Sequence, residues 1–120
     1  MTTILVVDDE FLITDVLAFA LEDEGFMVVR ASNGKKGLDV LDRERPSLVI
    51  TDYMMPVMNG VEFAQAIHGR HGEGMPIILM SGAHADLARQ SGHLFACIFD
   101  KPFVVSEVVD AVIRLVGRPG

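Results

Sequence analysis

Hydrophobic and polar positions change their period repeatedly along this chain. Five short apolar runs, rich in Val, Ile and Leu, have the composition of buried β-strands. Between and after them, apolar residues recur every three or four positions, as in amphipathic helices. We predict strands over Thr3–Asp8, Met27–Ala31, Ser47–Asp52, Pro76–Ser81 and Ala96–Asp100.

The helical segments follow the strands one by one. In the first of them Leu12, Val16, Phe19 and Ala20 recur at helical spacing, and Gly25 is a natural stop. Alternation of strands and helices favours right-handed crossovers and a parallel sheet. The predicted fold class is therefore α/β, a doubly wound five-stranded parallel sheet. We predict helices over Glu10–Glu24, Gly34–Arg43, Gly60–Gly69, Ala85–Gln90 and Val104–Val116.

Composition supports this fold and excludes some functions. The chain has 120 residues, which fits one domain, and 50% are hydrophobic, as expected for strands buried on both faces. No segment reaches the ~18 uncharged apolar residues of a membrane helix, and no basic leader is present, so we expect a cytoplasmic protein without membrane contact. The net charge of −7 argues against unaided nucleic-acid binding.

The last predicted helix carries more apolar residues than one core-facing stripe requires. Two interpretations are open. Either the helix is buried more deeply than usual, or its surplus apolar face meets a partner or a second copy of the chain as a homodimer. The apolar residues are Val104, Val105, Val108, Val109, Val112, Ile113, Leu115 and Val116.

Reactive side chains stand where four of the predicted strands end. In an open parallel α/β sheet the carboxyl ends of the strands form the crevice that binds ligands. Each residue alone has a simpler explanation, as a helix cap, a turn residue or a surface lysine. Their joint occurrence favours one shared site. The residues are Asp8 and Asp9 after the first strand, Asp52 in the third, Ser81 in the fourth and Lys101 after the fifth.

The chemistry of such a site follows from its charges. Three clustered carboxylates repel one another, and a divalent cation removes that cost; oxygen ligands favour Mg²⁺. A carboxylate can attack a phosphoryl group and form an acyl phosphate. The cation, a lysine and a hydroxyl would then hold the phosphoryl oxygens. A phosphate on Asp52 is expected to draw Ser81 and Lys101 inward, which makes the site a switch.

Four motifs in order match a known family. The chain resembles the receiver domain of two-component response regulators over nearly its whole length. This resemblance implies the flavodoxin-like strand order 2-1-3-4-5 and one receiver domain over residues 1–120 without an output domain. The motifs are Val6-Val7-Asp8-Asp9-Glu10, Thr51-Asp52-Tyr53-Met54-Met55-Pro56 with Met58-Asn59-Gly60, Met80-Ser81-Gly82-Ala83 and Asp100-Lys101-Pro102-Phe103.

The resemblance also implies a role for each acidic residue of the site. Asp52 matches the phosphoacceptor. Asp9 and Asp52 would bind Mg²⁺ directly, with the backbone carbonyl of Met54 as a third protein ligand. Asp8 would act on the cation through water.

The remaining roles concern the phosphoryl group. Ser81 matches the hydroxyl that moves to it and Lys101 the lysine that pairs with it, with a cis peptide expected between Lys101 and Pro102. The donors in the family are phosphohistidines on sensor histidine kinases or histidine phosphotransfer proteins, and acetyl phosphate can substitute. The chain would thus be a phosphoacceptor switch rather than an enzyme, with a downstream protein as its target.

One position departs from the family pattern. An aromatic switch residue often stands three positions before the lysine, where this chain has Ile98. Strand alternation aims the adjacent Phe99 at the opposite face. We therefore expect signalling to rely on movement of the loop after Ser81 and of the short helix Ala85–Gln90.

Other classes fit less well. A haloacid-dehalogenase-like phosphatase needs a second Asp two residues after its nucleophile, but Glu10 and Met54 occupy those positions. A receiver cut from a longer protein such as a hybrid kinase, or a phosphate-independent binding module, remains an alternative. The histidines have a conceivable metal spacing but no matching Cys or acidic partner to complete a site, and they are interpreted as surface residues: His68, His71, His84 and His93.

Overall fold

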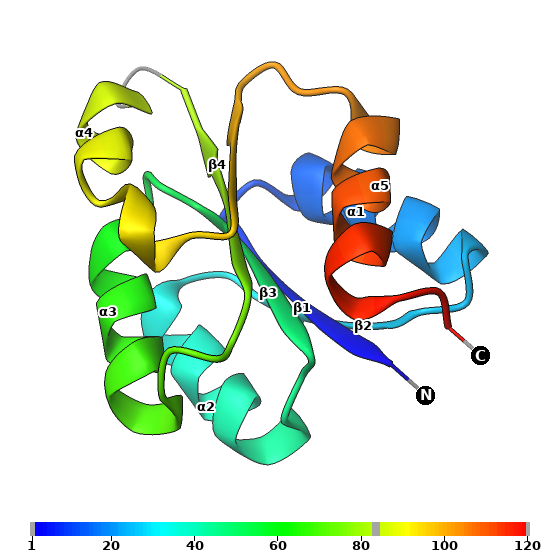
Figure 1. The fold of residues 1–120 in the computed structure, drawn as a ribbon, viewed down its shortest axis with the longest axis horizontal. Helices are drawn as coiled ribbons and strands as arrows, with labels where there is room; N and C mark the ends of the chain where they lie inside the picture. Colours follow the sequence, from blue (N-terminus) through cyan, green and yellow to red (C-terminus); the bar gives the residue numbers. More distant parts are fainter. Residues whose placement is uncertain (1, 83–84, 120) are drawn as a thin grey trace.

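A five-stranded parallel sheet runs through the middle of the molecule in the order β2-β1-β3-β4-β5 (Figure 1). The computed structural model describes residues 2–82 and 85–119, with the side chains of Ala85, Leu87 and Ala88 left aside. The strands are β1 (Thr3–Val7), β2 (Met27–Ala31), β3 (Leu48–Asp52), β4 (Ile77–Ser81) and β5 (Cys97–Asp100). The predicted fold class and strand order are confirmed.

The helices also lie where the sequence predicts them. They are α1 (Phe11–Asp23), α2 (Gly34–Glu44), α3 (Gly60–His71), α4 (Ala85–Gln90) and α5 (Val105–Val116), with an unpredicted 3₁₀ turn, η1 (Gly92–Leu94). Helix α3 was predicted to end at Gly69 but continues to His71. A helix ends where a residue leaves the helical conformation, and here Gly72 does so with φ of +80°.

Two hydrophobic clusters hold the helices against the sheet. Strand residues such as Ile4 and Val6 pack under α1 and α5, whereas Leu5 and Val7 pack under α2 and α3. Figure 1 shows the two pairs of helices on opposite sides of the sheet. Because successive strand residues point to opposite faces, strands covered on both sides must be apolar throughout. This accounts for the hydrophobic half of the composition.

Helix α1 is apolar on both of its sides. Its core side consists of Leu17, Ala18 and Leu21, all fully buried. The predicted stripe lies largely on the other side, where Leu12 is 80% and Phe19 77% exposed. Spacing alone cannot tell the two stripes apart, because both have the period of a helix. The solvent-facing side of α1 is therefore an exposed apolar surface.

Helix α5 buries one side against the sheet, much as α1 and α3 do, and leaves some of its apolar residues exposed. Val108, Val109 and Val112 are buried, and Val105 packs partly against the same cluster. Leu115 is 37% exposed. The homodimer through this helix stays a prediction. Among the described residues, no helix is both long and apolar enough to cross a membrane.

Candidate functional site

The carboxyl ends of β1, β3, β4 and β5 converge at one edge of the sheet. The register places Asp52 beside Met80 and Ser81 beside Asp100, and the Lys101 amide donates to the Ser81 carbonyl at 2.8 Å. Parallel strands in register end together, so residues far apart in the sequence become neighbours here. The Lys101–Pro102 peptide that follows β5 is cis, as expected.

Asp52 is held in place by the loop that follows it. Its side chain is 5% exposed, and its Oδ1 accepts a hydrogen bond of 2.9 Å from the Tyr53 amide. The start of α3 closes over this strand end, where the Gly60 amide donates to the Tyr53 carbonyl at 2.8 Å. A Cβ on Gly60 would lie 2.6 Å from the Asp52 carbonyl oxygen, closer than atoms tolerate. Only glycine allows this approach.

Helix α3 begins with a complete capping box. The Asn59 side chain accepts from the Glu62 amide, and the Glu62 side chain accepts from the Asn59 amide, both at 2.9 Å. The box satisfies two amides at the start of the helix that have no partner within it. This motif explains why the loop after Asp52 ends at Asn59 and why α3 starts so close to the site.

Lys101 is the cation of the site. Its Nζ lies 3.0 Å from Asp52 Oδ1, 3.6 Å from Glu10 Oε1 and 3.7 Å from Asp8 Oδ2. Burial lowers the pKa of this lysine, but the hydrogen bond and charge of Asp52, with the charges of Asp8 and Glu10, outweigh it and raise the pKa. The side chain is therefore a firmly charged ammonium that faces three carboxylates.

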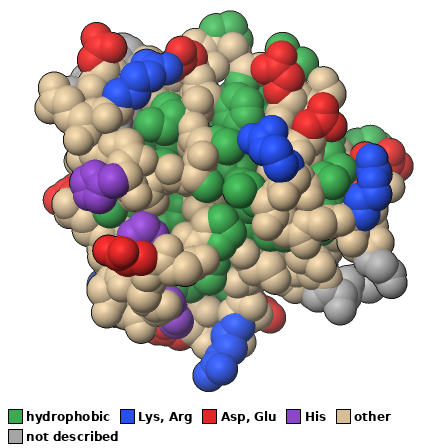
Figure 2. All heavy atoms as spheres, in the orientation of Figure 1, with side chains coloured by type: hydrophobic (Ala, Val, Ile, Leu, Met, Phe, Trp, Pro, Cys, Tyr) green, Lys and Arg blue, Asp and Glu red, His purple; other side chains and the backbone are tan. Residues whose placement is uncertain are grey.

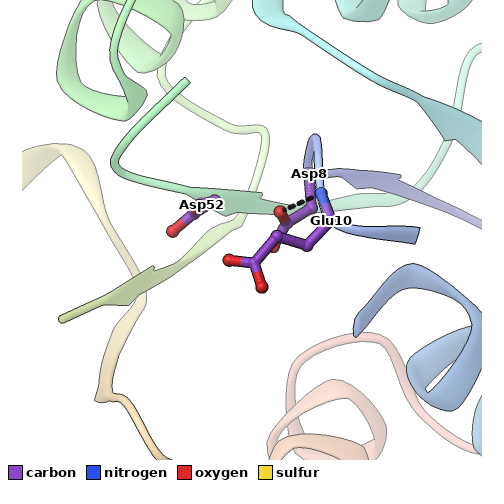
Figure 3. A group of neighbouring side chains, drawn as sticks. All are labelled: Asp8, Glu10 and Asp52. Atoms are coloured by element: carbon purple, nitrogen blue, oxygen red, sulfur yellow. Dashed lines mark hydrogen bonds between the residues drawn. The ribbon is translucent and has the colours of Figure 1, made fainter. Parts of the chain in front are cut away.

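Three carboxylates gather around the end of β3, and Figure 3 shows them. One oxygen from each of Asp8, Glu10 and Asp52 lies within 4.8 Å of the others. The Glu10 amide also donates to Asp8 Oδ1 at 2.9 Å, the dashed line in the figure. Glu10 was not among the predicted ligands, although its place two residues after Asp8 in an acidic run was a signal.

Asp9, in contrast, is exposed and lies outside this group of three. Its charge still acts on the site, because it is one of the influences that raise the pKa of Asp52. Met54 has an exposed side chain, and the part of its backbone carbonyl as a ligand stays a prediction, as does direct binding by Asp9.

Burial raises the pKa of both inner carboxylates. For Asp8 it outweighs the Glu10 amide bond and, together with the charge of Asp52, raises the pKa to about 6. For Asp52, burial outweighs the hydrogen bond and charge of Lys101 and the Tyr53 amide. Two buried carboxylates and an exposed third are thus only partly neutralised by one lysine.

A divalent cation fits this donor set. Asp8 Oδ2 is buried and has no hydrogen-bond partner among the described residues, which is costly for a carboxylate oxygen. The group offers oxygen ligands alone, and such ligands suit Mg²⁺. A cation among the carboxylates would offset both the cost of the unpartnered oxygen and the repulsion between the carboxylates. Asp8, Glu10 and Asp52 are the residues best placed to hold it.

Ser81, at the end of β4 next to the strand of Asp52, presents a second buried group without a hydrogen-bond partner among the described residues. The residue is fully buried, and its Oγ has no hydrogen-bond partner within residues 2–82 and 85–119. An unpaired buried hydroxyl costs about 1–3 kcal/mol. A hydrogen-bond acceptor added to the Asp52 side chain, within reach of Ser81 Oγ, would relieve that cost. Ala83 and His84, which follow in the sequence, lie outside the described residues.

The departure at Ile98 is visible in the sheet. Ile98 pairs with Leu79 in the register, and Phe99 packs with the cluster under α1 and α5. Phe99 therefore points to the face opposite the one that Ile98 occupies, as the alternation predicted.

The fold and the site define a class: a doubly wound α/β domain with a group of carboxylates and one lysine at the carboxyl edge of its sheet. Residues 4–113 match the family described as response regulator receiver domain. The chain belongs to this family.

Relatives agree with this assignment. The chain is 34% identical over 110 residues to sporulation initiation phosphotransferase F of Bacillus subtilis, covering 91% of this chain and 89% of that protein. It is 33% identical to the probable transcriptional regulatory protein TcrX of Mycobacterium tuberculosis, covering 98% of this chain and 51% of that protein. The chain thus spans about half the length of TcrX.

Solved structures show the same fold. The response regulator TrrA of Thermotoga maritima, in complex with Mg²⁺ and BeF, superposes with a TM-score of 0.87 at 31% identity, covering 97% of this chain and all of that one. The chemotaxis protein CheY4 of Vibrio cholerae superposes with a TM-score of 0.88 at 27% identity, covering 97% and 99%.

Proposed function

We propose that this receiver accepts a phosphoryl group from a phosphohistidine onto Asp52 in a Mg²⁺-dependent reaction. The phosphorylated form then binds another protein differently or passes the phosphoryl group on. The observation that carries the proposal is the place of Asp52. It is a buried carboxylate, 3.0 Å from the Lys101 ammonium, in a group of carboxylates suited to a divalent cation.

The transfer uses atoms that the site already orients. A carboxylate oxygen of Asp52 attacks phosphorus, the bond from phosphorus to the donor's histidine nitrogen breaks, and that nitrogen keeps the electron pair. The Tyr53 amide holds Oδ1, which restricts how the carboxylate can turn. The Lys101 ammonium offers a positive charge to the phosphoryl oxygens. The product is an acyl phosphate on Asp52.

Asp8, Glu10 and Asp52 would hold the Mg²⁺, with Asp9 and the Met54 carbonyl as further ligands that the family resemblance implies. When bound, Mg²⁺ supplies charge that neutralises the carboxylates and the phosphoryl oxygens. Asp8 Oδ2 is buried, has no hydrogen-bond partner among the described residues and pairs with Lys101 Nζ only at 3.7 Å, which supports this role.

The switch follows from the orphaned hydroxyl. Ser81 Oγ can donate to a phosphoryl oxygen, and Lys101 can keep its contact with the enlarged Asp52 side chain. Ser81 ends β4 ahead of the connection to α4, and Lys101 follows β5 ahead of α5. Movement at these two ends would change the surface that α4 and α5 present. With Ile98 at the aromatic switch position, we expect the loop after Ser81 and α4 to carry the signal.

The donor protein would dock on the exposed side of α1. Leu12 and Val16 from this helix, with Pro102, Phe103 and Val105, line a groove of about 510 Å³ that opens beside Lys101. An apolar surface next to a buried acceptor suits a protein that must bring its own histidine close to Asp52. The partner would be a sensor histidine kinase or a histidine phosphotransfer protein.

The length of the functional protein is part of the proposal. A chain that acts alone would resemble the sporulation phosphotransferase, most of which this chain covers. A receiver within a longer protein would resemble TcrX, of which the chain covers about half. We favour the single receiver, acting in the cytoplasm without nucleic-acid contact.

Intact mass after incubation with acetyl phosphate tests the proposal. The expected result is one phosphoryl addition that needs Mg²⁺ and is absent in Asp52→Asn, whose circular dichroism stays that of the wild type. Asp110→Asn, an exposed acid on α5, is the control and should be phosphorylated normally. An equally phosphorylated Asp52→Asn protein would overturn the assignment. If no addition occurs, a beryllofluoride titration decides between a donor-specific receiver, which binds it, and a phosphate-independent module, which does not.

A further inference from the structure

A second group of ligand-type side chains lies at the edge of the sheet opposite to Asp52. His68 from α3, Glu73 from the connection to β4 and His93 from η1 line one cavity of about 290 Å³. The cavity lies at the starts of β4 and β5, where Pro76 and Ala96 complete its wall. The two histidines come from segments far apart in the sequence, and α3 packs directly against η1.

His68 carries the unusual feature of this cavity. Its Nε2 is buried and has no hydrogen-bond partner among the residues that the structure describes. A neutral imidazole nitrogen offers either a proton or a lone pair, and leaving it unpaired costs about 1–3 kcal/mol. A lone pair directed at a metal ion would remove this cost, and neutral imidazole is a common metal ligand.

The other two side chains can adjust to a ligand. Glu73 and His93 are both exposed, and Glu73 stands between Gly72, with φ of +80°, and Gly74, around which there is open space. Only the carboxylate group at Asp52 has its ligand atoms already within 4.8 Å among the described residues. Binding therefore requires Glu73 and His93 to turn toward His68. Histidine side chains and an acidic one gather on the left of the face in Figure 2.

We propose that His68, Glu73 and His93 bind a divalent transition-metal ion of the Zn²⁺ type. Two imidazoles and one carboxylate are the ligands that Zn²⁺, Ni²⁺ and Cu²⁺ accept, and three protein ligands with one open position form a tetrahedral site. Mg²⁺ prefers oxygen ligands and belongs to the opposite edge. The chain would thus hold two cation sites that differ in ligand chemistry.

An ion at this position would act on the segment that follows α4, beyond the loop after Ser81. His93 stands on η1, directly after α4, whereas His68 and Glu73 belong to α3 and its connection. A bound ion therefore ties the segment between α4 and β5 to α3. A ligand that binds the folded state stabilises it, so Zn²⁺ should raise the melting temperature.

Calorimetric titration with Zn²⁺ tests the site. The untagged chain is used, with excess Mg²⁺ to occupy the carboxylate group at Asp52. We expect one Zn²⁺ per wild-type chain, bound at least tenfold more weakly by His93→Ala. The matched control is His71→Ala, because His71 also stands in the last turn of α3 but pairs with Asp42, 3.0 Å away, outside this cavity. This control should bind like the wild type.

Proton NMR of the imidazoles gives a second measurement that needs no variant of the half-buried His68. In the wild type, Zn²⁺ should shift the ring signals of His68 and His93 and leave those of His71 in place. Equal affinity of wild type and His93→Ala, an equal loss in His71→Ala, or unshifted His68 signals would overturn the proposal. Phosphorylation of His93→Ala by acetyl phosphate should stay normal, so the two sites can fail independently.

Discussion

Lys101 Nζ lies 3.0 Å from Asp52 Oδ1, although β4 separates their strands in the sheet. The strand between them, β4, ends at Ser81, whose buried hydroxyl has no partner among the described residues. A phosphoryl group on Asp52 would add acceptor oxygens at an edge that holds this cation and this unused donor. The resting site thus already contains both groups that would respond to phosphorylation.

Replacing Lys101 should separate the phosphorylation of Asp52 from the conformational change that follows it. Lys101→Ala should still be phosphorylated by acetyl phosphate, roughly ten to a hundredfold more slowly, because one preorganised charge is lost from the transferring group. The shifts that beryllofluoride causes in amide NMR signals of residues 82–94 should disappear. Lys36→Ala, an exposed lysine on α2, is the control. Wild-type shifts in Lys101→Ala would show that the lysine does not transmit the signal.

Asp8 should make the metal-free protein less stable as the pH rises. Its pKa is raised from 3.8 to about 6 by folding, so the folded state keeps a proton that the unfolded state releases. The stability from this residue is present below pH 3.8 and is lost as the pH rises through about 6. Neutral Asp8→Asn avoids this loss, which is at most about 3 kcal/mol at neutral pH.

Urea denaturation in EDTA measures this effect. At pH 7.5 Asp8→Asn should be more stable than the wild type, by a margin that shrinks toward pH 4, and Mg²⁺ should stabilise the wild type more than the variant. Asp110→Asn serves again as the exposed control. A margin independent of pH would contradict the role of the buried charge.

The exposed side of α1 should matter for a protein donor and not for a small one. Leu12 is 80% exposed and lines the groove beside Lys101, so Leu12→Asp removes apolar contact without opening the core. Phosphotransfer from a phosphorylated histidine phosphotransfer protein should slow about tenfold, whereas the rate with acetyl phosphate should not change. Met27→Asp, exposed at the start of β2, is the control. Slowing of both reactions by Leu12→Asp would point to damage at the acceptor site instead.

Two glycines of α3 should respond to alanine in opposite ways. A Cβ on Gly60 meets the Asp52 carbonyl at 2.6 Å, so Gly60→Ala must move backbone at the acceptor and should cost about 1–3 kcal/mol. Gly69 has nothing within 4 Å of a Cβ, and alanine there should stabilise the helix by about 0.5–1 kcal/mol. Urea denaturation of both variants checks the signs. Equal changes in stability for the two variants would mean that the close approach at Gly60 does not exclude a Cβ atom.

Sequence reasoning placed Asp52, Ser81 and Lys101 at one edge of the sheet for a physical reason. Strand and helix periods are local, and parallel strands in register bring their carboxyl ends together, so Asp52, Ser81 and Lys101 were expected at one edge. The fold class followed from the same alternation, whereas the strand order came only from the family resemblance. Glu10 was missed because a run of acids does not show which oxygens face the strand end.

The amino-acid sequence by itself determined the alternating elements, the parallel sheet and the residues that end its strands, because apolar period and turn residues act over a few positions. Only the tertiary structure decided which stripe of α1 faces solvent, since both stripes have a helical period. It also decided that His68 and His93 share a cavity with Glu73, where the sequence indicated separate surface residues. Such neighbours depend on how α3 packs against η1, a long-range contact that no local pattern encodes.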